Sequence, residues 1–176
     1  MDLSPFSRVN FPKATSVAVL QGSWEVSFDP KWGGPEKVTF DALQDWTGRK
    51  EEGIKYYAGS ANYRKSFDRP AGLPADSKIY LDLGAVHEIA RVKLNGKDLG
   101  VVWCAPWRID ISTAVKPGKN ELEIEVANLW PNRLIGDAAL PPEKRFTKTN
   151  VRPYRKDSPL LESGLLGPVT LQKVTP

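Results

Sequence analysis

The stretch that decides the fold is residues 120–128, NELEIEVAN. In it Leu122, Ile124 and Val126 alternate with three glutamates, which is the two-residue period of a strand with one face in the core and the other in water. A helix would place its apolar residues three and four positions apart. The stretch therefore predicts a half-buried β-strand.

Working outward from this strand, residues 89–95 show the same alternation. Arg91 and Lys93 share the polar side, and their charges suit a neighbouring strand that carries glutamates. Asn95-Gly96 follows directly and is typical of a tight hairpin turn. Further strands are predicted at 23–28, 37–40, 62–67, 78–83, 99–103, 108–111 and 169–174.

This pattern predicts an all-β protein, a jelly-roll β-sandwich with eight or nine main strands. A helical pattern is confined to one short turn at 41–46, and 14 Gly and 15 Pro residues punctuate the chain. We expect residues 1–19 to be a lead-in segment or linker and 20–176 a single sandwich domain. Residues 130–166, with five prolines, are predicted to be an irregular connection, and connections of that length are often functional.

Composition excludes several classes of protein. The lone Cys104 has no partner for an internal disulfide, and a single histidine, His87, excludes a Cys/His zinc cage. No apolar run reaches the length of a membrane span, and the N-terminal residues do not have the pattern of a signal peptide. The net charge is +4, but no nucleic-acid fold signature accompanies it, so we expect neither nucleic acid nor membrane as a partner.

Catalytic motifs are also missing. The sequence has no Gly-x-Ser-x-Gly elbow, and any Ser/His/Asp triad would need His87. The glycine-rich segments 32–35 and 165–168 are not followed by the Lys-Ser/Thr of a phosphate loop. Carboxylates that a glycosidase pair would need stand at Asp137, Glu143, Asp157 and Glu162, but their presence gives no geometry. We therefore predict a chain that is not an enzyme by itself.

Aromatic and polar residues in loops carry the functional hypothesis. Flat aromatic faces stack on sugar C–H groups, while amide and charged side chains pair with hydroxyls. The predicted ligand-binding residues are Trp103, Trp107, Trp130 and Tyr154 as the aromatic platform, with Asn132, Arg133, Asp137 and Arg152 as polar partners. The alternatives are that the tryptophans plug the ends of the sandwich and that Arg133 and Asp137 form an internal ion pair.

The segment 143–157 is strongly basic, with Lys144, Arg145, Lys148, Arg152, Arg155 and Lys156 interleaved with Phe146 and Tyr154. An acidic polymer, such as a uronate-containing pectin backbone, is therefore one hypothesis for the ligand, and its binding would weaken with salt. A neutral rhamnose- or galactose-bearing glycan stays open as the other.

An ordered set of motifs resembles a known family. It comprises 24–28 with Gly33-Gly34-Pro35, 53–59 leading to 63–67, 92–100 (VKLNGKDLG), 107–111, 117–122 and 128–137. Together these resemble the sugar-binding-like jelly-roll domain of glycoside hydrolase family 2. The likeness is closer still to the C-terminal β-sandwich of large bacterial enzymes that resemble the family 106 α-L-rhamnosidases, and it covers about residues 20–175.

The resemblance implies a galactose-binding-like β-sandwich that serves as an accessory domain of a secreted or periplasmic bacterial enzyme degrading plant polysaccharide. Its implied partners are a polysaccharide or oligosaccharide and the enzyme's catalytic domain, usually a barrel, which holds the catalytic residues. No cofactor is expected, and a structural calcium ion stays open because no acidic loop signature marks a site. The alternatives are a purely structural domain that packs on the barrel without a ligand, and a catalytic fragment.

Overall fold

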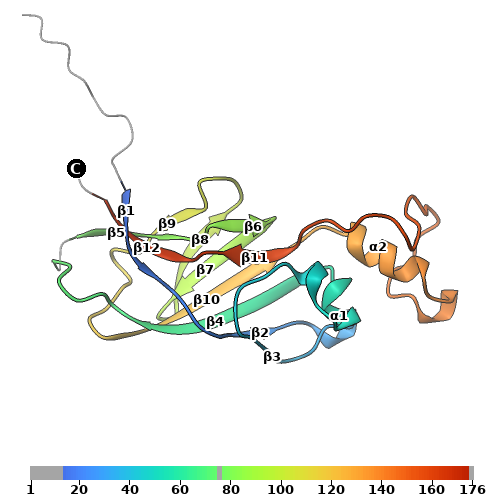
Figure 1. The fold of residues 1–176 in the computed structure, drawn as a ribbon, viewed down its shortest axis with the longest axis horizontal. Helices are drawn as coiled ribbons and strands as arrows, with labels where there is room; N and C mark the ends of the chain where they lie inside the picture. Colours follow the sequence, from blue (N-terminus) through green and yellow to red (C-terminus); the bar gives the residue numbers. More distant parts are fainter. Residues whose placement is uncertain (1–13, 75–76, 175–176) are drawn as a thin grey trace, which may run out of the picture.

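The computed structural model describes residues 14–74 and 77–174 and shows antiparallel sheets packed face to face (Figure 1). The six-stranded sheet has the order β3 (Val38–Phe40), β2 (Trp24–Ser27), β4 (Ser60–Asp68), β10 (Lys119–Ala127), β7 (Ile89–Leu94), β8 (Lys97–Val102). The four-stranded sheet has the order β1 (Ala14–Val19), β12 (Thr170–Val174), β5 (Lys78–Asp82), β9 (Arg108–Asp110). β11 (Gly164–Gly167) pairs with β6 (Ala85–His87) as a small third sheet. The all-β sandwich prediction is confirmed.

The deciding strand lies at the centre of the larger sheet. β10 pairs with β4 on one side and with β7 on the other, and Leu122, Ile124 and Val126 are fully buried in the core. The positive charges of Arg91 and Lys93 predict that their strand, β7, lies beside the glutamate-bearing strand β10, and it does. The ion pair of Arg91, however, is with Asp98 of β8. The Asn95-Gly96 turn joins β7 to β8 with both residues at positive φ, which is the conformation this dipeptide favours.

Aromatic residues fill one part of the core between the sheets. Trp46 Nε1 donates a hydrogen bond of 2.6 Å to the Tyr63 hydroxyl, which also accepts one of 3.2 Å from Leu165 N. Phe28 packs edge-to-face against Trp46 and Tyr57. Because Trp46 and Tyr63 are buried, the hydrogen bond between them lets the aromatic bulk enter the core without an unpaired indole N–H.

The structure differs from the sequence-based expectation at four places. Residues 14–19 of the expected lead-in segment form β1, while 1–13 lie outside the described residues. β6 and β11 are further strands. The expected helical turn at 41–46 is wrong: helical turns occur instead at η1 (Pro30–Trp32), η2 (Trp46–Gly48), α1 (Glu52–Lys55) and η3 (Pro142–Lys144).

The largest difference is α2, Pro131–Ala138, in the stretch predicted to be an irregular connection. Local propensity does not predict this helix, because Asn132, Gly136 and Asp137 are poor helix formers. Five of its eight residues are buried against the rest of the chain. Tertiary packing therefore stabilises the helix. α2 and the loop after it project from the end of the sandwich opposite the C-terminus (Figure 1).

Candidate functional site

The helix α2 begins directly after the central strand β10 and brings polar side chains to the end of the sandwich. Pro131 occupies its first turn, where a missing N–H costs nothing. A Cβ at Gly136 would lie 2.7 Å from Cβ of Tyr56 and 2.6 Å from the Arg133 guanidinium. Glycine at this position therefore allows the close approach of α2 to the segment that carries Tyr56.

A buried ion pair lies within α2, and each of its partners contacts the loop after the helix. Arg133 Nε and Asp137 Oδ1 lie 3.0 Å apart, one helical turn from each other, with side chains only 5% and 4% exposed. The two atoms are not aligned for a hydrogen bond, so the contact is electrostatic. The guanidinium lies 4.6 Å from the ring centroid of Phe146. Burial lowers the pKa of Arg133, and the Asp137 carboxylate opposes that shift.

Asp137 also anchors the start of the loop. Its Oδ2 accepts hydrogen bonds from the backbone N of Thr147 (2.7 Å) and from the Thr147 hydroxyl (2.6 Å). Arg145 Nε donates to the carbonyl oxygens of Asp137 and Leu140, both at 3.0 Å, where a cation is favoured by the helix dipole. The loop is thus fixed against the last turn of α2.

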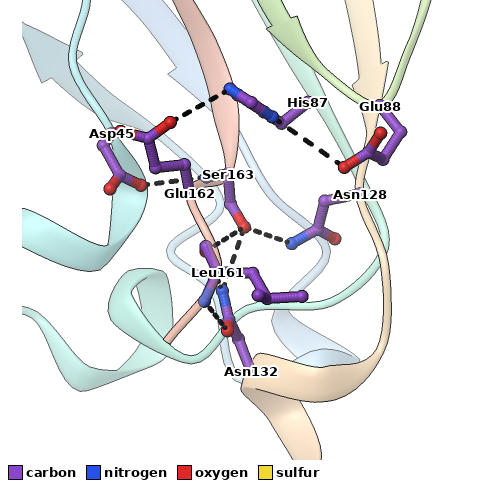
Figure 2. Close-up of polar contacts among 8 residues, drawn as sticks. All are labelled: Asp45, His87, Glu88, Asn128, Asn132, Leu161, Glu162 and Ser163. Atoms are coloured by element: carbon purple, nitrogen blue, oxygen red, sulfur yellow. Dashed lines mark hydrogen bonds and ion pairs between the residues drawn. The ribbon is translucent and has the colours of Figure 1, made fainter. Parts of the chain in front are cut away.

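The far end of the loop is anchored by a second polar network, which Figure 2 shows. Asn132 donates to the Leu161 carbonyl (2.7 Å) and accepts from Leu161 N (2.8 Å). The Ser163 hydroxyl accepts from Asn132 (3.0 Å) and Asn128 (3.3 Å), and Ser163 N donates to Asp45 Oδ1 (2.9 Å). Residues 139–160 are therefore held at both ends, which favours one defined shape for the segment.

A pocket of about 520 Å³ lies between α2 and this loop. It is lined on the helix side by Leu134, Asp137 and Ala138 and on the loop side by Pro142 and most of the segment 145–156. Loop-side members include Thr147, Thr149 and the partly buried Tyr154. A volume of this size is in the range of small-ligand sites. We call it the basic pocket, after the five cations among its lining residues: Arg145, Lys148, Arg152, Arg155 and Lys156.

The charges of the basic pocket are not balanced. None of its five cations has a carboxylate within 4.0 Å in the part of the chain that the structure describes. Its one acidic lining residue, Asp137, is buried and faces Arg133. Elsewhere, by contrast, exposed cations such as Arg64, Arg91 and Arg108 stand against carboxylates. The pocket is therefore a positively charged site with one aromatic side and several apolar lining residues.

The structure brings only part of the predicted set together. Arg152, Tyr154 and Asp137 line the basic pocket. Asn132 and Arg133 are buried behind it, and the internal Arg133–Asp137 ion pair weighed as an alternative is present. The ligand-binding roles stay predictions, and the structure favours a positioning role for the three residues of α2.

The three predicted platform tryptophans lie outside the basic pocket. Trp107 is partly buried and packs against the core. Trp103 and Trp130 are 72% and 70% exposed. The polar and charged pocket residues that the predicted set omitted are Arg145, Thr147, Lys148, Thr149, Arg155 and Lys156. Their signal in the sequence is the run of positive charge in 143–157, which does not specify which side chains converge.

His87 lies beside the second network, between two carboxylates (Figure 2). Its Nδ1 is 3.9 Å from Glu88 Oε1 and its Nε2 is 3.5 Å from Glu162 Oε2. The neighbouring Ser163 hydroxyl donates to the Leu161 carbonyl (3.1 Å) and has no hydrogen bond to His87 among residues 14–74 and 77–174. The arrangement is thus not that of a Ser/His nucleophile pair.

The described ranges, 14–74 and 77–174, have neither a metal-binding cluster nor a membrane-spanning helix. They contain no group of three or more His, Cys, Asp or Glu side chains placed to hold a metal ion. Among the same residues, no helix has the length and apolarity needed to cross a membrane.

Comparison with known families matches residues 41–158 to the glycosyl hydrolase 2 galactose-binding domain-like family. The chain belongs to this family. A solved relative is the rhamnosidase from Novosphingobium sp. PP1Y, with a TM-score of 0.85 and 40% identity over 92% of this chain. A protein of Formosa agariphila named "Putative beta-glucuronidase" is 41% identical over 87% of this chain. A Ruminococcus gnavus β-glucuronidase, solved with D-glucuronic acid, shares the fold with a TM-score of 0.63 at 21% identity over 93% of this chain and 31% of its own.

The relatives are much longer than this chain. It spans 15% of the rhamnosidase and 15% of the Formosa protein. The galactose-binding-like domain thus corresponds to one part of larger proteins of the glycoside hydrolase class, and the resemblance to family 2 and to a rhamnosidase is confirmed.

Proposed function

We propose that this chain is a non-catalytic, glycan-binding accessory domain of a bacterial glycoside hydrolase, and that the basic pocket is its ligand site. The observation that carries the proposal is the pocket itself: about 520 Å³, lined by hydroxyls, cations and Tyr154, on a loop anchored at both ends. A sugar ring offers C–H groups to the aromatic side chain and hydroxyls to the polar ones.

The names of the relatives support the enzyme class. One is a rhamnosidase and another is named as a β-glucuronidase, so the parent enzyme would act on rhamnose- or uronate-bearing polysaccharide such as plant cell-wall pectin. Catalysis would take place in another domain of the parent, which would be secreted or periplasmic because its polymer lies outside the cell. The proposed role of the accessory domain is to keep the enzyme on this polymer, with micromolar to millimolar affinity and without a cofactor.

The test is retention of the 176-residue chain in gels that contain pectic or hemicellulosic polysaccharides. Tyr154→Ala should reduce retention at least about tenfold, as loss of a stacking face does. Trp103→Ala is the matched control, an exposed aromatic residue outside the pocket, and should bind like the unmodified chain. Loss of binding in the control but not in Tyr154→Ala would move the site to the tryptophans. Failure of the folded chain to bind any polymer would refute the proposal.

A second candidate function, a structural domain packed on a catalytic barrel, is favoured by a different surface. Ile89, Trp103, Leu129, Trp130 and Leu161 are all exposed apolar residues. Ile89 begins β7, whereas Trp103 and Leu129 follow the antiparallel neighbours β8 and β10, so these three residues lie at the same end of neighbouring strands of the larger sheet. If this surface packs on a barrel, the isolated chain should self-associate, and size-exclusion chromatography of Trp103→Ser should show less association.

A further inference from the structure

The charge of this chain is concentrated in the segment that forms the basic pocket. Residues 144–156 contain six Lys and Arg residues and no Asp or Glu, whereas the net charge of the whole chain is +4. The rest of the chain is therefore net negative. The high pI of the chain, about 9.1, thus comes from one loop. Positive charge that is concentrated in one loop creates a positive electrostatic potential at that place on the surface.

The positive groups of the basic pocket remain available to a ligand. Arg145 uses only Nε in holding the loop to α2, and its two terminal nitrogens have no acceptor among the residues that the structure describes. Arg152 and Lys148 line the pocket, are exposed and form no ion pair within the described ranges. A guanidinium group with free N–H donors matches the two oxygens of a carboxylate in a bidentate contact.

Among the described lining residues of the pocket, no carboxylate is left without a partner. Asp137, its one acidic lining residue, is buried, stands 3.0 Å from Arg133 and accepts two hydrogen bonds from Thr147. Its negative charge is compensated inside the protein. The lining residues therefore present a net positive charge to a ligand.

The shape of the site favours a sugar over a nucleic acid. Proteins that bind single-stranded nucleic acids use an extended groove along the backbone, with several aromatic residues on which bases stack. The positive groups here converge on one pocket with Tyr154 as its aromatic lining residue, a composition suited to one or a few charged sugar rings.

From these observations we infer that the basic pocket selects sugars that carry a negative group, a carboxylate or a sulfate ester, over neutral sugars. This inference rests on the proposed glycan-binding function of the same site. Arg145 and Arg152 pair with the anionic oxygens, Lys148 and Lys156 add a less directional attraction, and Tyr154 stacks on the ring.

The experiment compares polymers that differ only in charge. Polygalacturonate and its carboxyl-reduced, neutral form are titrated into the 176-residue chain by calorimetry, together with a sulfated galactan, a neutral galactan and duplex DNA. Affinity for polygalacturonate should exceed that for the reduced polymer at least about tenfold, the effect of one or more hydrogen bonds to a charged group. Raising the salt from about 0.01 to about 0.1 M, which shortens the screening length from about 30 to about 10 Å, should weaken the acidic complex and leave neutral binding unchanged.

The matched variants are Arg152→Gln and Arg64→Gln. Both arginines are exposed, but Arg64 lies on β4 beside Glu123, outside the pocket. Arg152→Gln should lose about tenfold in affinity for polygalacturonate at low salt, and Arg64→Gln should lose little. Both variants should keep the melting temperature of the unmodified chain.

The outcomes separate the inference from the proposed function. Equal affinity for the acidic and reduced polymers overturns the inference and leaves glycan binding intact. Absence of binding to every polymer overturns both. Tighter binding of DNA than of any acidic polymer, or equal losses in the two arginine variants, also overturns the inference. Preference for the sulfated galactan over all carboxylates supports it with sulfate as the anion.

Discussion

Replacing Asp137 by asparagine tests whether the buried ion pair holds the basic pocket in shape. The substitution keeps the size of the side chain and an oxygen that accepts from Thr147, but it removes the negative charge 3.0 Å from Arg133 Nε. The guanidinium, whose side chain is 5% exposed, then has no carboxylate within 4.0 Å among the described residues, and of the carboxylates only the more distant Glu52 still favours its charge. Removing one partner of a buried pair costs about 3–5 kcal/mol, a large share of the about 5–15 kcal/mol that stabilises a domain.

A double-mutant cycle isolates the coupling between the two charges. Arg133→Met keeps an apolar chain against Phe146 and Tyr56 and leaves Asp137 with its two hydrogen bonds from Thr147. The double variant Arg133→Met/Asp137→Asn buries no charge at this place. Its loss of stability should therefore be smaller than the sum of the single losses by about 2 kcal/mol or more.

The assay is equilibrium unfolding in urea, followed by tryptophan fluorescence and by far-UV circular dichroism. Asp157→Asn serves as the control, because Asp157 is an exposed carboxylate of the same loop, and a change there should stay within about 0.5 kcal/mol. A cost of less than about 1 kcal/mol for Asp137→Asn, or additive single losses, would refute the argument that this pair stabilises the packing of α2 and the loop.

Three further predictions concern the core, a close backbone contact and the surface. Burial raises the pKa of Tyr63 to about 12, so its contribution to stability is fully present below about pH 10 and is lost between pH 10 and 12. The expected loss of unfolding free energy is about 3 kcal/mol. Urea titrations at several pH values measure this dependence on pH, and Tyr63→Phe should remove it. Gly53→Ala should destabilise the domain by more than about 2 kcal/mol, because its Cβ would lie 2.0 Å from the Gly33 carbonyl oxygen, whereas Gly48→Ala, with no atom within 4 Å, should melt like the parent chain. Trp130→Ser should change the unfolding free energy by no more than about 0.5 kcal/mol, since Trp130 is 70% exposed, and a loss above about 1.5 kcal/mol would contradict that exposure.

The strand pattern of this protein could be predicted from the sequence because it depends on short-range geometry. Successive side chains of a strand point to opposite faces, so Leu122, Ile124 and Val126 identify their own buried face. Asn95-Gly96 specifies its hairpin in the same local way, since both residues tolerate positive φ. The basic character of 144–156 is likewise a property of composition.

The candidate site depended on contacts between residues far apart in the chain. Leu161 and Asn132 are 29 positions apart, and Thr147 and Asp137 are 10 apart, yet these bonds fix both ends of the loop and so decide which cations line the pocket. α2 forms from a sequence with poor helix propensity because its buried residues make tertiary contacts, including the hydrogen bonds of Asn132 and Asp137, that supply what local preference does not. Periodicity therefore determined the sandwich, whereas only the tertiary structure decided that Arg133 and Asp137 face each other inside the protein, and that Arg152 and Tyr154 line a pocket.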